Sequence, residues 1–368
     1  MKDIDGYSAT NENNVFSFNP DKDSFKAKNF SFSLKSPITK KLNIDFTSWY
    51  NNNEAEFDAS APPDDSVSEN TDKTANLKLN YATNNAWSQS YSIGYASDET
   101  LTDSTFFASN INSERKIFDW QNDIVIGTQH LVTAGFNYYE DQVDNFDVGA
   151  DTLVYDEKID NSAIYTNWQT AFGKNDFQLG LRYDDHSDFG SKTTGQVAWG
   201  RQIDKVKVRA SYGTAFKAPT VNELFHPGFF GSFAGNPDLQ SETSESFEIG
   251  ANHAFSKTQR FDVSIYDTSI EDLIAFEGTN SQAINIGEAS IRGLELGYTF
   301  NNNIWVIQGN LTLQAATNED TNSALLRRAD QKLAVNVSHS IKKTGNIEAE
   351  LINSSKRPDI GIQLTKCD

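Results

Sequence analysis

The sequence contains very little sulfur. Cys367 is its only cysteine, and methionine occurs once among 368 residues. An internal disulfide or a thiolate metal cluster needs more than one cysteine, so both are excluded. The five histidines are scattered without metal-ligand spacing, and the sequence shows neither a Ser/His/Asp or Cys/His arrangement nor a Gly-rich phosphate loop. We therefore expect no enzyme and no catalytic residues.

Basic residues and long apolar runs are also scarce. The chain has 31 Lys and Arg against 51 Asp and Glu, a formal net charge of −20. No basic patch is available to release phosphate counterions, which excludes a nucleic-acid partner, whereas an acidic surface suits divalent cations. No apolar run approaches the roughly 20 residues that a membrane-spanning helix needs. The N-terminal residues lack the pattern of a signal peptide, so none is expected in this sequence.

Apolar and polar residues alternate along nearly the whole chain. In residues 177–184, Phe, Leu, Leu and Tyr occupy one face, and Gln, Gly, Arg and Asp occupy the other. The same alternation occurs in residues 30–35, 206–212, 294–300 and 333–338. It predicts about sixteen strands, many of about ten residues or longer, which exceeds the usual length in soluble proteins. The polar face carries too much charge for a sandwich interior and fits a water-filled lumen.

Short and long connections alternate between these strands. Short turns are expected at residues 36–40, 83–86, 127–129, 173–176, 203–205, 256–258, 301–303 and 342–345. Longer polar connections are expected near residues 52–73, 98–112, 142–160, 185–190, 217–242, 277–283 and 317–327. Outer-membrane barrels show this asymmetry, with periplasmic turns at one end and extracellular loops at the other. The predicted fold class is therefore all-β, a transmembrane antiparallel up-and-down β-barrel in the outer membrane of a Gram-negative bacterium.

Aromatic residues near the strand ends support the same interpretation. As a set, they would form the girdles where a barrel meets the membrane surface, with outer-membrane lipid as their partner. The set consists of Tyr81, Tyr95, Tyr138, Tyr183, Tyr212, Tyr298 and Phe300. The chain has no repeat at the period of about 40–50 residues that a propeller would show.

One loop carries a specific resemblance. Residues 211–225 (SYGTAFKAPTVNELF), followed by GNPDL at 235–239 and ETS at 242–244, closely resemble the signature of TonB-dependent outer-membrane receptors. Ser241 stands where that family usually has proline. Pro219 and Pro237 lack the N–H donors that a strand ladder needs, and the Gly235-Asn236 pair permits a turn. We expect most of these residues to form a stable connection and not to contact a ligand, so the substrate-binding residues are unknown.

Further motifs resemble the cobalamin (vitamin B12) receptors of this family. They are IGEASIRGLE at residues 286–295 and LLRRA at residues 325–329, although Arg-Arg variants of the second also occur in siderophore receptors. The resemblance implies import of cobalamin or a related corrinoid, driven by the TonB complex. A ferric-siderophore receptor remains an alternative, as does a passive outer-membrane channel or adhesin.

Acidic residues in two neighbouring loops are candidate metal ligands. Asp21 and Asp23 precede the first long strand, and Asp58 lies in the next long connection. Calcium takes six to eight oxygen ligands, so carboxylates spaced i, i+2 on a loop can converge on one ion. Cobalamin receptors bind calcium in a D-x-D-G-F setting with an aspartate from the following loop, and the resemblance assigns Asp21, Asp23 and Asp58 to this role. Ser24 replaces the glycine, and Ser8 replaces an earlier aspartate for which Asp3 or Asp5 would substitute.

The resemblance also implies what lies outside the sequence. TonB-dependent receptors have a plug domain, through which TonB acts, and a barrel of about twenty-two strands. We expect residues 1–368 to be a fragment of that barrel domain, without the plug and without the last strands.

Overall fold

The computed structural model describes residues 2–8, 10–14, 18–60, 62, 64–104, 108–228, 231–278, 280–341, 345–359 and 362–365. Cys367 and most of the predicted turn at 342–345 lie outside these residues. The chain forms two compact units. The first comprises residues 1–126, 132–166 and 183–191, and the second comprises residues 127–131, 167–182 and 192–368.

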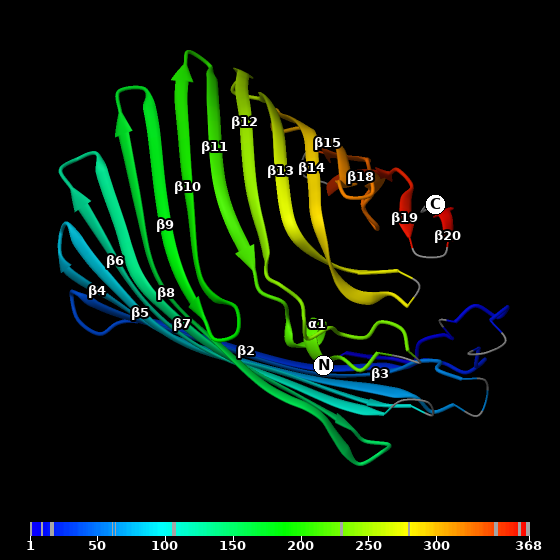
Figure 1. Ribbon diagram of the computed structural model, residues 1–368. Helices are drawn as coiled ribbons and strands as arrows, with labels where there is room; N and C mark the ends of the chain where they lie inside the picture. Colours follow the sequence, from blue (N-terminus) through cyan, green and yellow to red (C-terminus); the bar gives the residue numbers. More distant parts are fainter. Residues whose placement is uncertain are drawn as a thin grey trace. The chain divides into compact units, whose positions relative to one another are not determined.

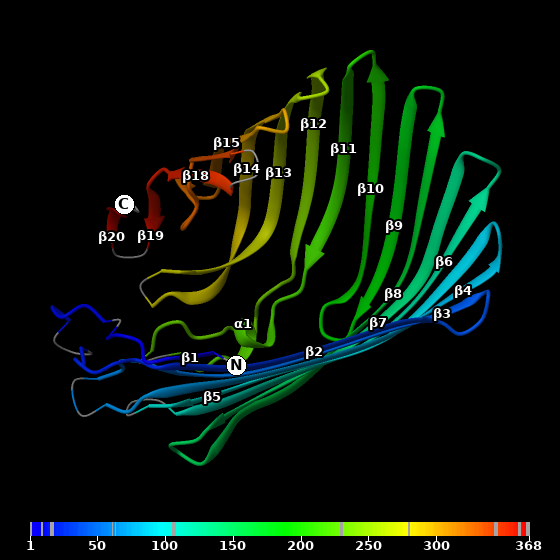
Figure 2. The same cartoon turned by 180° about the vertical axis from the view of Figure 1, so that it is seen from behind.

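The first unit is built from long antiparallel strands that pair in chain order. They are β1 (Lys2–Ile4), β2 (Phe25–Pro37), β3 (Leu42–Glu56), β4 (Val67–Asn84), β5 (Trp87–Asp103) and β6 (Ser109–Ile126). Most of β7 (His130–Asp147) and β8 (Thr152–Phe172) belongs to this unit as well. Figures 1 and 2 show β2 to β6 running side by side, joined at one end by tight turns.

The second unit continues in the same manner. Its elements are most of β9 (Asn175–His186) and β10 (Gly190–Ile203), then β11 (Val206–Lys217), α1 (Val221–Phe225), β12 (Glu242–Ser256), β13 (Gln259–Glu277), β14 (Gln282–Asn301), β15 (Trp305–Asn318), β16 (Ser323–Ala324), β17 (Gln331–Ile341) and β18 (Gly345–Ser354). From β10 to β15 each strand pairs with the next, and β15 pairs with both β16 and β17. A separate hairpin consists of β19 (Arg357–Asp359) and β20 (Ile362–Thr365).

This architecture confirms the predicted fold class. Strands β1 to β18 form an antiparallel up-and-down sheet. Among the described residues, sixteen of these strands have ten residues or more, and the two additional ones, β1 and β16, have three and two. None of the helices in this part of the chain is long and apolar enough to cross a membrane.

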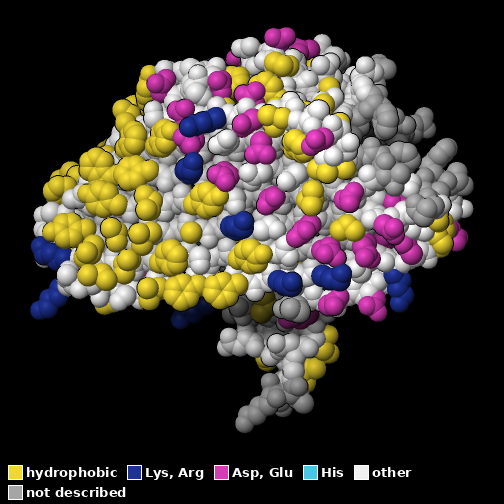
Figure 3. All heavy atoms as spheres, turned by 90° about the horizontal axis from the view of Figure 1, so that it is seen from below, with side chains coloured by type: hydrophobic (Ala, Val, Ile, Leu, Met, Phe, Trp, Pro, Cys, Tyr) yellow, Lys and Arg dark blue, Asp and Glu magenta, His cyan; other side chains and the backbone are white. Residues whose placement is uncertain are grey.

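The apolar face of the strands is exposed. In the second unit, Ile249, Ile265 and Leu294 lie opposite one another on β12, β13 and β14, and 62% of Ile265 is accessible to solvent. Figure 3 shows hydrophobic side chains gathered on one part of the molecular surface and acidic side chains gathered on another. Soluble monomers rarely expose contiguous apolar surface of this extent, so the face is suited to lipid.

The opposite face is polar and held by side-chain hydrogen bonds. In the first unit, Asn51 Nδ2 donates to Asp72 Oδ2 at 2.8 Å, and Asn76 Nδ2 donates to Ser92 Oγ at 3.1 Å. These groups would need partners if they were packed against an apolar layer, but in an aqueous lumen they can also bind water. The predicted division of each strand into a lipid face and a water face is therefore present.

In the described part of the chain, buried apolar residues cluster in a long connection and at the strand ends next to such connections. Val221, Leu224 and Leu239 are at most 5% exposed in the connection from β11 to β12. A second cluster at the ends of β14 and β15 contains Ile286, Ala289, Ala316 and Leu325. The connection from β11 to β12 is therefore a folded structure with an apolar interior of its own, and the ends of β14 and β15 carry a second small apolar cluster.

Two predicted loops are much shorter than expected. The connection expected at 98–112 is reduced to the five residues between β5, which ends at Asp103, and β6, which begins at Ser109. The polar stretch at 142–160 belongs mainly to β7 and β8, which are joined by only four residues, Val148 to Asp151. The backbone ladder continues here although the side chains are charged, because backbone hydrogen bonds do not depend on an apolar face. The predictions of long loops at 98–112 and 142–160 were wrong.

Candidate functional site

The three predicted metal ligands come together in the first unit. Asp21 and Asp23 lie on the segment that leads into β2, and Asp58 follows β3. A carboxylate oxygen from each lies within 4.8 Å of those of the other two. Asp21 is exposed, whereas Asp23 and Asp58 are half-buried. The i, i+2 spacing and the pairing of β2 with β3 thus bring these side chains together.

Hydrogen bonds fix the two segments that carry the aspartates. The backbone N–H of Ser24 donates to Glu56 Oε2 at 2.8 Å, and the N–H of Glu56 donates to the Ser24 carbonyl at 3.0 Å. Asn19, which is 7% exposed, donates through Nδ2 to Asp21 Oδ2 at 2.9 Å and to the Asp64 carbonyl at 3.2 Å. These hydrogen bonds join the segment before β2 to the connection after β3 and orient the Asp21 carboxylate.

The N-terminal segment packs against the same cluster. Gly6 has a φ of +67°, and a Cβ atom at this position would lie 1.7 Å from the Asp23 carbonyl oxygen, so only glycine fits. Ser8 Oγ donates to Asp58 Oδ2 at 3.2 Å. Asp3 lies opposite Lys26 in the β1–β2 pair, and within the described residues neither Asp3 nor Asp5 belongs to the carboxylate group. In the described N-terminal segment, Ser8 thus hydrogen-bonds a carboxylate of the cluster, and Gly6 lies against the backbone of Asp23.

The electrostatics of the cluster favour a cation. Loss of hydration, together with the negative charges of Asp58 and Asp23, raises the pKa of Asp21 above its ordinary value. Mutual repulsion of this kind is relieved when a positive ion lies between the carboxylates. The donors are all oxygen atoms, which hard cations such as calcium prefer. The residues present therefore fit calcium.

Asp64, in the same connection as Asp58, has a different role. It is 6% exposed and accepts hydrogen bonds from the N–H groups of Ala59 at 2.6 Å and Ser60 at 2.7 Å, and from the Ser66 hydroxyl. Burial alone would raise the pKa of Asp64, but the hydrogen bonds from Ser66, Ser60 and Ala59 outweigh burial and hold the pKa below its usual range. This carboxylate shapes the turn after Asp58.

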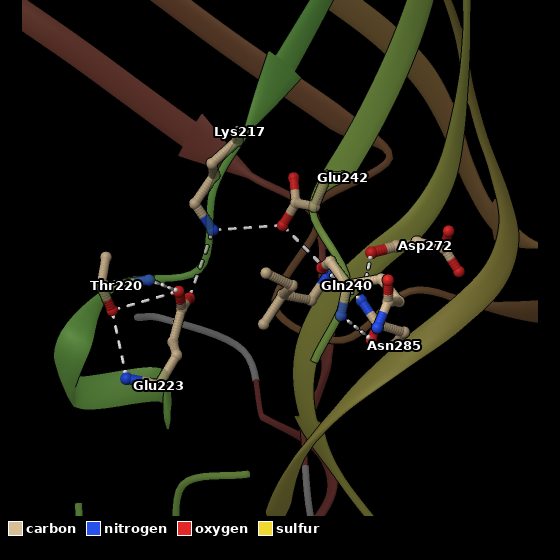
Figure 4. Close-up of polar contacts among 8 residues, drawn as sticks. Lys217, Thr220, Glu223, Gln240, Glu242, Asp272 and Asn285 are labelled. Atoms are coloured by element: carbon tan, nitrogen blue, oxygen red, sulfur yellow. Dashed lines mark hydrogen bonds and ion pairs between the residues drawn. The ribbon is translucent and has the colours of Figure 1, made fainter. Parts of the chain in front are cut away.

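The connection between β11 and β12 in the second unit is held by an ion-pair cluster. Lys217 Nζ, at the end of β11, lies 3.2 Å from Glu223 Oε1 and 3.1 Å from Glu242 Oε1 (Figure 4). Glu223 also accepts from the Thr220 N–H at 2.8 Å, while the Glu223 N–H donates to Thr220 Oγ1 at 3.1 Å. This reciprocal pair caps α1. Glu242 in turn accepts from the Ile274 N–H at 2.9 Å, which joins the connection to β13.

The second part of this connection is attached to β13 and β14. The Gln240 N–H donates to Asn285 Oδ1 at 2.9 Å, and Asn285 Nδ2 donates to the carbonyls of Gln240 at 3.1 Å and Asp272 at 2.7 Å. The Asn236 N–H donates to the Glu223 carbonyl at 2.8 Å. The signature residues Lys217, Glu223 and Asn236 thus make contacts within the connection and its flanking strands, as expected for a stable connection.

Sequence reasoning did not identify the cluster around Lys217. The sequence T-x-x-E at 220–223 directly after Pro219 is a signal for a capped helix and could have predicted α1. The contacts of Lys217 with Glu242 and of Gln240 with Asn285 join residues 25 and 45 positions apart, and no local pattern reveals them.

Comparison with known proteins gives a consistent result. The family described as TonB dependent receptor-like, beta-barrel matches residues 3–342. The chain is 28% identical over 346 residues to the vitamin B12 transporter BtuB of Photobacterium profundum. The aligned region covers 91% of this chain and 54% of that protein. It is 30% identical over 240 residues to BtuB of Vibrio vulnificus, covering 63% of this chain and 38% of that protein. The chain therefore spans about half the length of these relatives or less.

Solved structures show the same fold. The ferric enterobactin receptor PfeA of Pseudomonas aeruginosa superposes with a TM-score of 0.76 over 96% of this chain and 60% of that one, at 12% identity. The copper transporter OprC superposes with a TM-score of 0.77 over 95% of this chain and 61% of that one, at 16% identity. The exposed apolar face, the folded outer loops and the family match lead to one conclusion: the chain belongs to the β-barrel family of TonB-dependent receptors, in the Gram-negative outer membrane.

Proposed function

We propose that the chain forms barrel wall and outer loops of a receptor that imports cobalamin or a related corrinoid, with energy delivered through the TonB complex. The observation that carries the proposal is the similarity, over 91% of this chain, to a relative described as a vitamin B12 transporter. The convergence of Asp21, Asp23 and Asp58 adds support from a different source. The proposed role is that of a receptor and not of an enzyme.

Calcium is the cofactor that we propose for this receptor. Asp21, Asp23 and Asp58 would hold the ion, with Asn19 and Ser8 orienting two of their carboxylates. A bound divalent cation supplies positive charge that offsets the repulsion between the three carboxylates. The segment before β2 and the connection after β3 would then be joined, so that these outer loops keep one arrangement for the incoming substrate.

A binding experiment tests the substrate. Outer-membrane vesicles that contain the protein are incubated with cyanocobalamin or with a ferric catecholate, each with and without calcium. We expect saturable binding of cyanocobalamin that is stronger with calcium. Binding of the ferric catecholate alone would replace the proposal with a siderophore receptor, and binding of neither would favour a passive channel or an adhesin.

Calcium binding is tested separately by calorimetric titration with the metal alone. Asp23→Asn removes one carboxylate charge from the cluster and keeps the side-chain shape, so calcium affinity is expected to fall. Asp65→Asn is the matched control, because Asp65 is an exposed acidic residue of the same connection outside the cluster. Equal calcium affinity in the two variants would contradict the metal assignment, whatever the outcome for the substrate.

A further inference from the structure

The face of the second unit that meets lipid changes character abruptly along its strands. On β12 the side chains of this face are, in order, Ile249, Phe247, Glu245 and Thr243, since alternate residues share a face. Ile249 and Phe247 are 52% and 46% exposed. Along these four side chains, the lipid-facing surface therefore changes from apolar groups to carboxylate and hydroxyl groups in the direction of the long connections.

Neighbouring strands repeat the same transition at the same level. Opposite Phe247 are Tyr212 on β11 and Asp267 on β13, and Asp267 Oδ2 pairs with Arg292 Nε on β14 at 3.1 Å. Both partners of this ion pair are more than half exposed. An exposed ion pair is stable at a polar interface and costly in hydrocarbon, so this row marks the outer edge of the lipid band.

A groove lies directly beyond this edge. It has a volume of about 310 Å³, which is within the size range of small-ligand sites. The groove is lined by residues of β10, β11, β12 and β13, which are neighbouring strands in Figure 1. The lining residues on the outward face of these strands include Thr214, Phe216, Thr243, Glu245, Ser269 and Glu271. The strand pairing places these residues on the same face of the sheet. Glu245 lies opposite both Thr214 and Ser269, and Thr243 lies opposite both Phe216 and Glu271.

The lining suits a carbohydrate. Hydroxyl groups of Thr and Ser can donate and accept, carboxylates of Glu accept strongly from the hydroxyl groups of a sugar, and Phe216 offers an apolar surface for ring C–H groups. Among the described residues that line the groove, Lys192 is cationic, but it shares the face of Gln196, opposite to that of Val197, so its side chain belongs to the other side of the sheet. A ligand recognised mainly through its anionic groups would meet two carboxylates here, whereas a polyhydroxylated ring would meet matching donors and acceptors.

We propose that this groove binds a sugar of the glycolipid headgroups in the outer leaflet. Its position supports a membrane-anchored occupant, because the groove is continuous with the lipid-facing rows Phe247–Ile249 and Ile265–Leu294, on the side of the long connections. The proposal concerns the lipid-facing side and is independent of the receptor's cargo, which would pass through the other side of the wall.

The test uses the protein purified from outer membranes and placed in phospholipid nanodiscs with increasing amounts of rough lipopolysaccharide. Native mass spectrometry counts the glycolipid that remains bound. The variant Thr243→Val/Glu271→Gln removes one hydroxyl and one charge from the groove and is expected to bind about 25-fold more weakly, since each lost hydrogen bond is worth about fivefold. The matched control is Ser246→Ala/Thr268→Val, which removes hydroxyls from the same two strands on the opposite face, where they bond each other at 2.8 Å.

Three results would overturn the proposal. Equal glycolipid binding by the groove variant and the control would show that the groove does not recognise the sugar. Release by a chelator, combined with no effect of Thr243→Val alone, would assign the interaction to cation bridges with lipid phosphates. If the free core oligosaccharide competed as well as the intact glycolipid at equal concentration, the membrane anchor would contribute nothing to binding. Thr243→Ser keeps the hydroxyl and is expected to retain binding, which separates recognition from a folding defect.

Discussion

The ion-pair cluster at Lys217 allows a quantitative prediction for Lys217→Met. This change removes two contacts, at 3.1 Å to Glu242 and 3.2 Å to Glu223, and retains most of the apolar stem. Hydrogen bonds to charged groups are worth about 1.5–3 kcal/mol when buried, but 48% of the Lys217 side chain is exposed, which reduces each contact to about 1 kcal/mol. We therefore expect the connection from β11 to β12 to lose about 2 kcal/mol of local stability, a roughly 30-fold increase in its opening equilibrium.

Hydrogen exchange measures this opening directly. The N–H groups of Gly235 and Asn236 donate to the carbonyls of His226 and Glu223 at 2.8 Å each, and they report on the folded connection. Lys205→Met is the control, because Lys205 is exposed in the turn between β10 and β11. Unchanged protection of the two amides in Lys217→Met would show that Glu223 and Glu242 are held by their backbone and Thr220 contacts alone, and would refute the anchoring role.

Three further predictions follow from single side chains. Gly6→Ala is expected to displace the N-terminal segment, because its Cβ would overlap the Asp23 carbonyl, and increased proteolysis before β2 would reveal this change. The pKa of Asp64 is lowered in the folded protein, so its stabilising effect is present above the unfolded pKa and is lost as the pH falls through the folded one. The protection of the Ser60 N–H against exchange, measured relative to the intrinsic exchange rate at each pH, should therefore fall in acid, and less so in Asp64→Asn. Ile265→Lys places a charge on the lipid face at a cost of about 2–4 kcal/mol at the bilayer midplane and less near its edge, so a denaturant titration in lipid should show reduced stability, whereas a midpoint equal to that of the wild type would argue against lipid contact.

The strand pattern was predictable because it depends on local alternation. Phe177, Leu179 and Leu181 are all more than 40% exposed, on the face that their spacing indicated. Turn positions such as 127–129 and 203–205 also agree with the observed strand ends. Both features depend on neighbouring residues only, and a period of two leaves little freedom in the choice of face.

The remaining features depend on contacts that sequence spacing does not encode. The polar residues at 142–160 have the composition of a loop, yet the backbone pairing of β7 and β8 extends through most of them. The grouping of Asp21, Asp23 and Asp58 agrees with expectation, but the contribution of Ser8 depends on how closely Gly6 approaches Asp23, which only the fold determines. Calcium, the substrate and the fragment nature of the chain stay predictions.

The location of the apolar interiors has a practical consequence for handling the protein. Val221, Leu224 and Leu239 are buried within the connection from β11 to β12 and expose almost no surface to their surroundings. Exchange of lipid for detergent changes the surroundings of the strands and leaves these small cores untouched. The loops should therefore keep their shape, and resist proteases, after the protein has been extracted from the membrane.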